Sequence, residues 1–205
     1  MSGDQIWGPP LGSIPQDLRR PEDDTTTPIT FPPLQIRPGE VWRAVVARAP
    51  LEAKLLIGTR EQGGNNRGAL VEAMLRDEGG KPGDPWCLAF VQHVYGRCFA
   101  RFNAKVNLPN GLHCGRFARA CAARLPLAVT HVPAIGAIAL RYPSGFDGPG
   151  HCGIVTGFDA VNCETIEGNT NAAGDRDSTT GDGVWDKARA LSYWTSFVDI
   201  SRLDP

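Results

Sequence analysis

The chain has 205 residues, enough for one domain with a sizeable core or for a core and an extended arm. Its 21 Lys and Arg residues against 22 Asp and Glu residues leave a formal net charge of −1, which argues against a general nucleic-acid or anionic-lipid surface. No stretch approaches the ~18 continuous apolar residues of a membrane helix, and six cysteines are too few for a disulfide-dense scaffold of this length. We therefore expect a soluble protein that neither binds nucleic acid nor inserts into a membrane.

Residues 1–40 have the composition of an extended or disordered arm. Eight of the 17 prolines fall within residues 1–38, together with the polar run 22–27, and spaced apolar residues are missing. A docking or delivery role for this arm is an alternative to a surface-draped terminus. The first residues also lack the charged start and apolar run of a secretory signal, so we expect synthesis in the cytosol. The remaining residues, 41–205, are expected to form one domain.

The first half of this domain predicts helices, in chain order at 51–58 after Pro50, at 66–77 with Asn66 as the cap, from Asp84 and Pro85 onward, and at 113–124. The third helix has an apolar stripe at helical spacing, made by Cys87, Phe90, Val91, Val94 and Cys98. In the fourth, Phe117 and Cys121 should face inward. All four helices precede the strand-like segments.

The second half predicts strands, at 134–140, 152–158, 163–167 and 196–200, separated by Gly, Pro, Asp and Asn. Helices first and strands second indicate an α+β domain, in which N-terminal helices pack on a C-terminal antiparallel sheet.

Cys87 is the cysteine with the strongest chemical signal. It falls in the first turn of a predicted helix, where unpaired backbone amides and the positive end of the helix dipole favour a thiolate. The alternative is that Cys87 simply packs inward with Phe90 and Val91.

His151 begins one predicted strand, and Glu167 and Asn169 end the next. A hairpin turn at 159–161 that pairs position 158 with 162 brings His151 opposite Asn169 and places Glu167 on the same face, because strand side chains alternate. A slip of one residue would separate them. With this register, a thiol nucleophile, a histidine base and a third group that orients the imidazole can meet. Either Glu167 or Asn169 could be that third group.

In these segments the chain resembles the CHAP amidohydrolases and peptidases, a branch of the papain-like superfamily found in bacterial and phage enzymes that lyse cell walls. The similar segments are GTREQGGNNRG at 58–68, PWCLAFV at 85–91, PAIGAIA at 133–139, GHCGIV at 150–155, IEGNT at 166–170 and GDGV at 181–184. They keep the family's order over roughly residues 55–200. Ala137 stands where the family usually has an acidic residue, and Cys152 where it has a small apolar one.

The resemblance implies a papain-like fold with Cys87 as nucleophile, His151 as base, and Glu167 with Asn169 as the orienting and polar-stabilising pair. It implies hydrolysis of amide bonds in the peptide part of peptidoglycan, as an amidase or an endopeptidase, without a cofactor. The backbone amide of Cys87 is the natural oxyanion donor. Trp86, beside the nucleophile, is expected either to line the substrate groove or to pack in the core.

Metal binding is not expected. Cys98, His113, Cys114 and Cys121 lack the paired spacing that preorganises a zinc site. A loose calcium-loop pattern at Asp175, Asp177, Thr179 and Asp186 has Thr180 where glycine is needed and no bidentate Glu, so we interpret it as a solvated acidic loop.

Without a signal peptide, a wall-degrading enzyme is expected to reach the periplasm or cell wall by phage lysis, on a virion or through a secretion machine. If it is an antibacterial toxin, an immunity protein in the producer is an expected partner. Two alternatives stay open: a catalytically silent domain that binds wall peptides or a partner, and a cysteine amidase that acts on a cytosolic amide.

Overall fold

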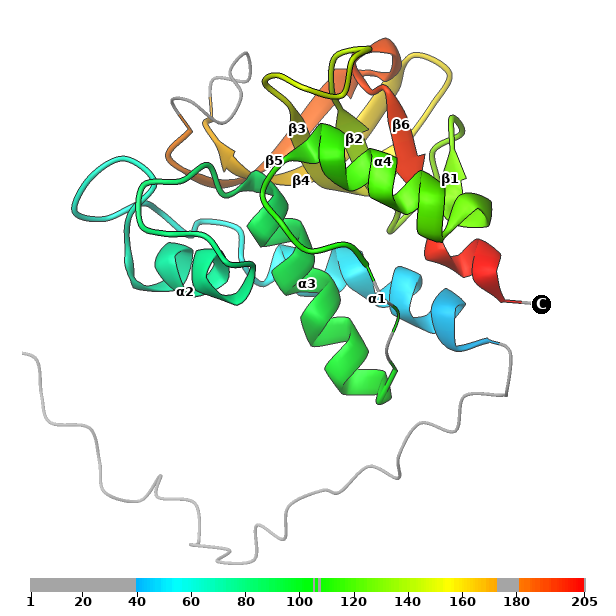
Figure 1. Ribbon diagram of the computed structural model, residues 1–205, viewed down its shortest axis with the longest axis horizontal. Coiled ribbons are helices and arrows are strands. Elements are labelled where there is room, and N and C mark those ends of the chain that lie inside the picture. Colours follow the sequence, from blue (N-terminus) through cyan, green and yellow to red (C-terminus); the bar gives the residue numbers. More distant parts are fainter. Residues whose placement is uncertain (1–39, 105, 107, 173–180, 205) are drawn as a thin grey trace, which may run out of the picture. The chain divides into compact units, whose positions relative to one another are not determined.

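The computed structural model describes residues 40–104, 106, 108–172 and 181–204. Four helices come first, α1 (Val41–Lys54), α2 (Ala69–Asp77), α3 (Cys87–Phe102) and α4 (Cys114–Arg124). Six strands follow, β1 (Val129–Thr130), β2 (Ile138–Arg141), β3 (His151–Phe158), β4 (Asn162–Thr170), β5 (Gly183–Ala190) and β6 (Ser196–Val198). The predicted α+β class, with N-terminal helices and a C-terminal sheet, is confirmed (Figure 1). The predicted arm, 1–40, lies outside the described residues except for Glu40.

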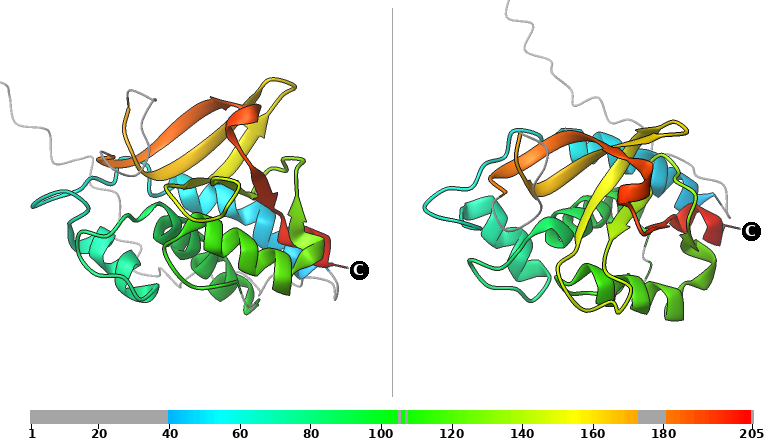
Figure 2. Two further views of the ribbon diagram at one scale, coloured as in Figure 1. Left: turned by 45° about the horizontal axis from the view of Figure 1, so that its top comes forward. Right: turned by 90° about the horizontal axis from the view of Figure 1, so that it is seen from above.

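The strands form one antiparallel sheet in the order β1-β6-β2-β3-β4-β5. The helices lie on one side of this sheet, and α1 and α3 cross beneath β3 and β4 (Figure 2). The helix-facing side contributes apolar side chains such as Leu140, Ile154 and Ile166 to the main core. The opposite side carries a smaller cluster of Ala137, Ala139, Val155, Cys163, Trp194 and Phe197.

Helix α1 differs from the predicted helix at 51–58. It begins at Val41, and Pro50 lies in its interior instead of at its start. Proline has no amide hydrogen to donate to the carbonyl of Val46, four residues earlier. The helix nevertheless continues because Val45, Ala49 and Ala53 are fully buried. Tertiary packing thus outweighs the local signal of a proline.

The starts of α2 and α3 also lie a few residues later than predicted. Asn66 does not cap α2. It has a left-handed φ of 55°, and its side-chain amide donates to the carbonyl of Gly83 at 3.1 Å. Asp84 does not cap α3 either, because its carboxylate accepts the backbone N–H of Lys81 at 2.9 Å. Helix α3 therefore begins at Cys87, and the predicted inner stripe of this helix is buried as expected.

The β3–β4 hairpin has a different turn from the predicted one. Near the turn, Phe158 pairs with Cys163, one residue away from the predicted partner, so the predicted pairing is wrong there. An irregularity between Val155 and Gly157 then adds one residue to β3, and beyond it Ile154 pairs with Ile166. The two one-residue deviations cancel. At Ile154 and Ile166, next to the candidate site, the pairing is therefore the predicted one.

Candidate functional site

Cys87 is the first residue of α3, and only 2 % of its surface is exposed. The first N–H groups of a helix have no acceptor within the helix, so they and the helix dipole favour a negative sulfur there. Its helix packs closely on the sheet. A Cβ added at Gly168 of β4 would stand 2.6 Å from the Cβ of Phe90, so only glycine lets this strand lie so near α3.

His151 and Glu167 form a buried pair that bridges β3 and β4. Nε2 of His151 lies 2.8 Å from Oε2 of Glu167, and both side chains are fully buried. Gly153 makes this possible, because a Cβ there would stand 2.7 Å from Cγ of Glu167.

The Glu167 carboxylate is held by two further groups. Arg189 of β5 donates from Nε to Oε1 at 2.7 Å and from a terminal nitrogen to Oε2 at 2.6 Å, a bidentate contact. Thr165 donates its hydroxyl to Oε1 at 2.7 Å. Sequence reasoning missed Arg189 because strand β5 was not predicted. Its signal in the sequence is weak, since the segment GVWDKARA alternates but carries several charges.

Neighbouring groups, and not burial, decide the charges of Glu167 and His151. Burial raises the pKa of Glu167, but the hydrogen bonds from Arg189 and His151 lower it to about 2. Burial lowers the pKa of His151, but its interactions with Cys87 and Glu167 raise it to about 9. Near neutral pH, Glu167 is an anion and His151 an imidazolium. An ionised carboxylate only accepts hydrogen bonds, so Nε2 carries the hydrogen that it donates to Glu167.

The Cys87 thiol has a pKa well below its ordinary value. Hydrogen bonds from Cys114 and from Cys152 contribute most, and the positive charge of His151 adds to them, so together they outweigh burial. The other imidazole nitrogen of His151, Nδ1, is buried and has no hydrogen-bond partner among the described residues. With Nε2 committed to Glu167, Nδ1 is the nitrogen left for proton exchange. A thiolate beside an imidazolium is the charge state of an activated cysteine nucleophile.

The other five thiols shift in the opposite direction. The neighbouring Cys87 sulfur and burial raise the pKa of Cys114 and of Cys152 well above the ordinary value. Burial raises the pKa of Cys98 to about 12, that of Cys121 to about 12 and that of Cys163 to about 11. All six cysteines of the chain are buried and free, so no disulfide joins them. Cys87 is distinguished from the other five by the sign of its pKa shift and not by exposure.

Asn169 lies near the end of β4 in an irregularity between Glu167 and Thr170, where it adopts a left-handed φ of 55°. Asparagine tolerates this conformation better than most residues. Its side chain is fully buried. Of the two predicted orienting residues, Glu167 makes the contact to Nε2 of His151. A stabilising role of Asn169 in the reaction stays a prediction.

Cys152 lies next to the site, although its side chain and that of His151 are on different faces of β3. Alternation along β3 does place it on the helix-facing side, opposite to His151 and Val155. However, its sulfur lies within 4.8 Å of the sulfurs of Cys87 and Cys114. Cys87 therefore has neighbours from both faces of β3, His151 from one and Cys152 from the other. These three sulfurs form the group of described side chains best placed to hold a metal ion.

Trp86 does not line a groove. It is fully buried, and its indole N–H donates to Glu61 at 2.8 Å. Of the two positions expected for Trp86, the groove and the core, the structure shows the core.

The residues of the calcium-like pattern lie mostly outside the described residues, namely Asp175, Asp177, Thr179 and Thr180. Asp186 belongs to β5.

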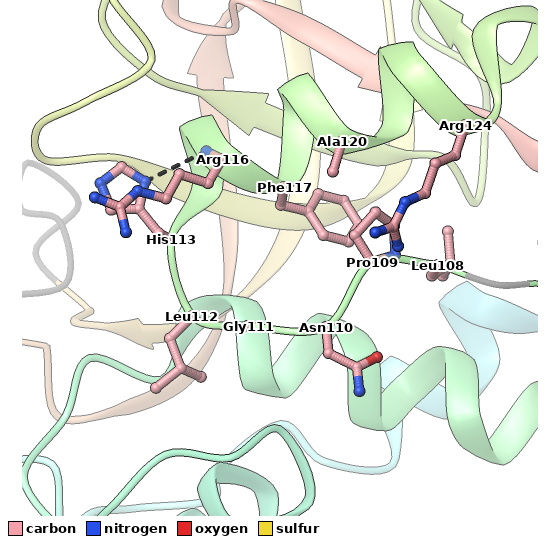
Figure 3. A pocket seen from close by; sticks show the side chains of 10 residues that line it. All are labelled: Leu108, Pro109, Asn110, Gly111, Leu112, His113, Arg116, Phe117, Ala120 and Arg124. Carbon is pink, nitrogen blue, oxygen red and sulfur yellow. Dashed lines mark hydrogen bonds between the residues drawn. The ribbon is translucent and has the colours of Figure 1, made fainter.

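A cavity of about 830 Å³ lies outside the site. It lies between residues 108–113, which precede α4, and the α4 side chains of Arg116, Phe117 and Arg124 (Figure 3). His113, at its rim, caps α4 by accepting the N–H of Arg116 at 3.4 Å. None of the residues of the Cys87 and His151 network lines it.

Within the described part of the chain, no helix is long and apolar enough to span a membrane. The comparisons with known proteins give no relative: no family model matches the chain, and neither a curated protein nor a solved structure is significantly similar to it.

Proposed function

We propose that the protein is a cysteine hydrolase of amide bonds. The observation that carries the proposal is the buried line of Cys87, His151, Glu167 and Arg189, which supplies a thiolate, an imidazolium and an anchored carboxylate. The membership of the CHAP family proposed from sequence supports the same reaction and adds the substrate class, the peptide part of peptidoglycan.

In the proposed reaction, the Cys87 thiolate attacks the amide carbonyl and a carbon–sulfur bond forms. The backbone N–H of Cys87, in the first turn of α3, stabilises the oxyanion. Nδ1 of His151 gives its proton to the leaving amine, and the carbon–nitrogen bond breaks. His151 then takes a proton from water, whose oxygen attacks the thioester, and the acid product leaves with Cys87 regenerated as a thiolate.

Substrate must gain access to a thiol that is almost fully covered. The segment 142–150 joins β2 to β3 and packs on the start of α4, where the Phe146 carbonyl lies against Gly115. At its end, Gly150 contacts the Cβ of Cys114. We propose that movement of this segment opens the path to Cys87, since its middle is exposed and it leads directly into His151.

Digestion of purified cell-wall sacculi tests the reaction. We expect soluble muropeptides from the wild type and none from Cys87→Ala, while Cys121→Ala, a control at another buried thiol, retains activity. Mass spectrometry of the products distinguishes a cut between sugar and peptide from a cut within the peptide. The proposal fails if the folded wild type releases no fragment, or if Cys87→Ala releases as many as the control.

Alkylation separates an enzyme from a silent binding domain. Because all six cysteines are buried, differences in their rates with iodoacetamide reflect thiolate content more than exposure. At pH 6, Cys87 should be modified before Cys98, Cys121 and Cys163, whose pKa values are raised by burial. Equal labelling of these four thiols would favour the binding domain.

The proposed place of action is the cell wall, reached from the cytosol by a secretion machine or a phage. We expect growth arrest when a signal sequence directs the wild type to the periplasm, and normal growth with cytosolic wild type or periplasmic Cys87→Ala. Normal growth in all three cases would leave an amide in the cytosol as the better substrate class.

A further inference from the structure

Three sulfur atoms from distant parts of the chain meet beside the candidate site. Cys87 begins α3, Cys114 begins α4 and Cys152 is the second residue of β3. Their sulfurs lie within 4.8 Å of one another, and Cys87 and Cys114 are 4.0 Å apart. No more than 3 % of any of these residues is exposed. The spacing of the three cysteines in the chain does not predict this group, since they share no short motif.

The distances suit a metal ion with sulfur ligands. A zinc–sulfur bond is about 2.3 Å, which puts sulfurs about 4.0 Å apart around a trigonal ion and about 3.8 Å apart around a tetrahedral one. The sulfurs of Cys87 and Cys114 are 4.0 Å apart, which matches these separations. The two sulfur–sulfur distances that involve Cys152 are no longer than 4.8 Å. A disulfide instead needs about 2.05 Å.

Two helix starts and one close approach of the backbone bring the sulfurs together at this place. Cys87 and Cys114 are each the first residue of a helix, so two sets of unpaired N–H groups and two positive dipole ends meet near the sulfurs. Gly150 also lets Cys114 come close, because a Cβ at position 150 would stand 2.9 Å from the Cβ of Cys114.

We propose that Cys87, Cys114 and Cys152 form a binding site for one thiophilic metal ion, Zn²⁺ or Cu⁺. The ion replaces the protons that remain on the thiols, which pass to solvent, and bonds to three thiolates without any change of oxidation state. The site itself stands whether or not the protein is a hydrolase. Its effect on catalysis rests on the proposed function: a metal-bound Cys87 sulfur cannot attack a carbonyl, so the ion would act as an inhibitor.

Metal titration of the full chain, purified with a phosphine reductant and stripped of metal, tests the site. Co²⁺ serves as the spectroscopic probe, and we expect one ion per chain with a sulfur-to-cobalt charge-transfer band. Competition with a chromogenic zinc chelator and with a copper(I) chelator then decides between Zn²⁺ and Cu⁺. Cys114→Ala and Cys152→Ala should each weaken binding by more than about 100-fold, since even the loss of outer-shell partners costs 10–100-fold.

Cys121→Ala and Cys163→Ala are the matched controls, because both thiols are buried and lie outside the group, and they should bind as the wild type does. Circular dichroism shows which variants are folded, and the charge-transfer band of the wild type does not depend on any variant. Absence of that band, or equal binding by the ligand variants and the controls, overturns the proposal. Metal binding without any digestion of sacculi would support the site while rejecting the proposed function.

Discussion

Arg189→Met isolates the contribution of the arginine that anchors Glu167. It removes two charge-assisted hydrogen bonds of 2.7 and 2.6 Å to a carboxylate that is fully buried. The methionine stem keeps much of the packing against Tyr193, whose ring lies 4.6 Å from the guanidinium carbon. The substitution therefore mainly removes the positive charge that compensates the buried Glu167 carboxylate.

Hydrogen bonds to charged groups contribute about 1.5–3 kcal/mol each, and removal of one partner of a buried ion pair costs about 3–5 kcal/mol. Glu167 keeps its contacts with Thr165 and His151, so we expect a loss of about 3–4 kcal/mol. Urea denaturation followed by circular dichroism measures the free energy of unfolding of wild type and variant.

Arg67→Met is the matched control. Arg67 contacts Glu72 at the same 2.7 Å, but 49 % and 23 % of the two side chains are exposed, so we expect almost no change in stability. The double variant Glu167→Gln/Arg189→Met removes the uncompensated charge and should be more stable than Arg189→Met alone. Equal losses at Arg189 and Arg67, or a double variant less stable than Arg189→Met, would refute the role given to burial.

Three further outcomes follow from the same contacts. Because the pKa of Glu167 is lowered in the folded state, its contribution to stability is present above pH 4.5 and disappears as the pH falls toward 2; acid unfolding should lose part of this dependence in Glu167→Gln. The opposite sign holds for His151, whose contribution is complete below pH 6.5 and is lost as the pH rises through about 9, so hydrolysis should decline above that pH in a rate profile. Gly168→Ala should lower the free energy of unfolding by about 1–3 kcal/mol, because its Cβ would overlap Phe90 and Trp86, whereas Gly96→Ala, with open space at the Cβ, should not destabilise α3.

The sequence by itself determined the fold class and the local setting of the main candidates. Apolar residues at helical spacing identified the buried face of α3, and Cys87 fell at its start because the preceding turn signals end there. Strand-length runs bounded by turn residues identified the two strands that carry His151 and Glu167, and the side chains of these two residues do meet. Such periodic patterns agree with the structure because they follow from backbone geometry and burial.

Tertiary structure alone decided the rest. The hairpin turn was predicted with the wrong pairing, and the predicted pairing returns at Ile154 and Ile166 only because β3 contains an extra residue. Arg189 became visible as a partner of Glu167 only once β5 was paired beside β4. The three sulfurs of Cys87, Cys114 and Cys152 meet because two helix starts and one strand start converge. No local propensity encodes such long-range packing, so Cys87 could be identified as a candidate nucleophile from the sequence, but its neighbours Cys114 and Cys152 could not.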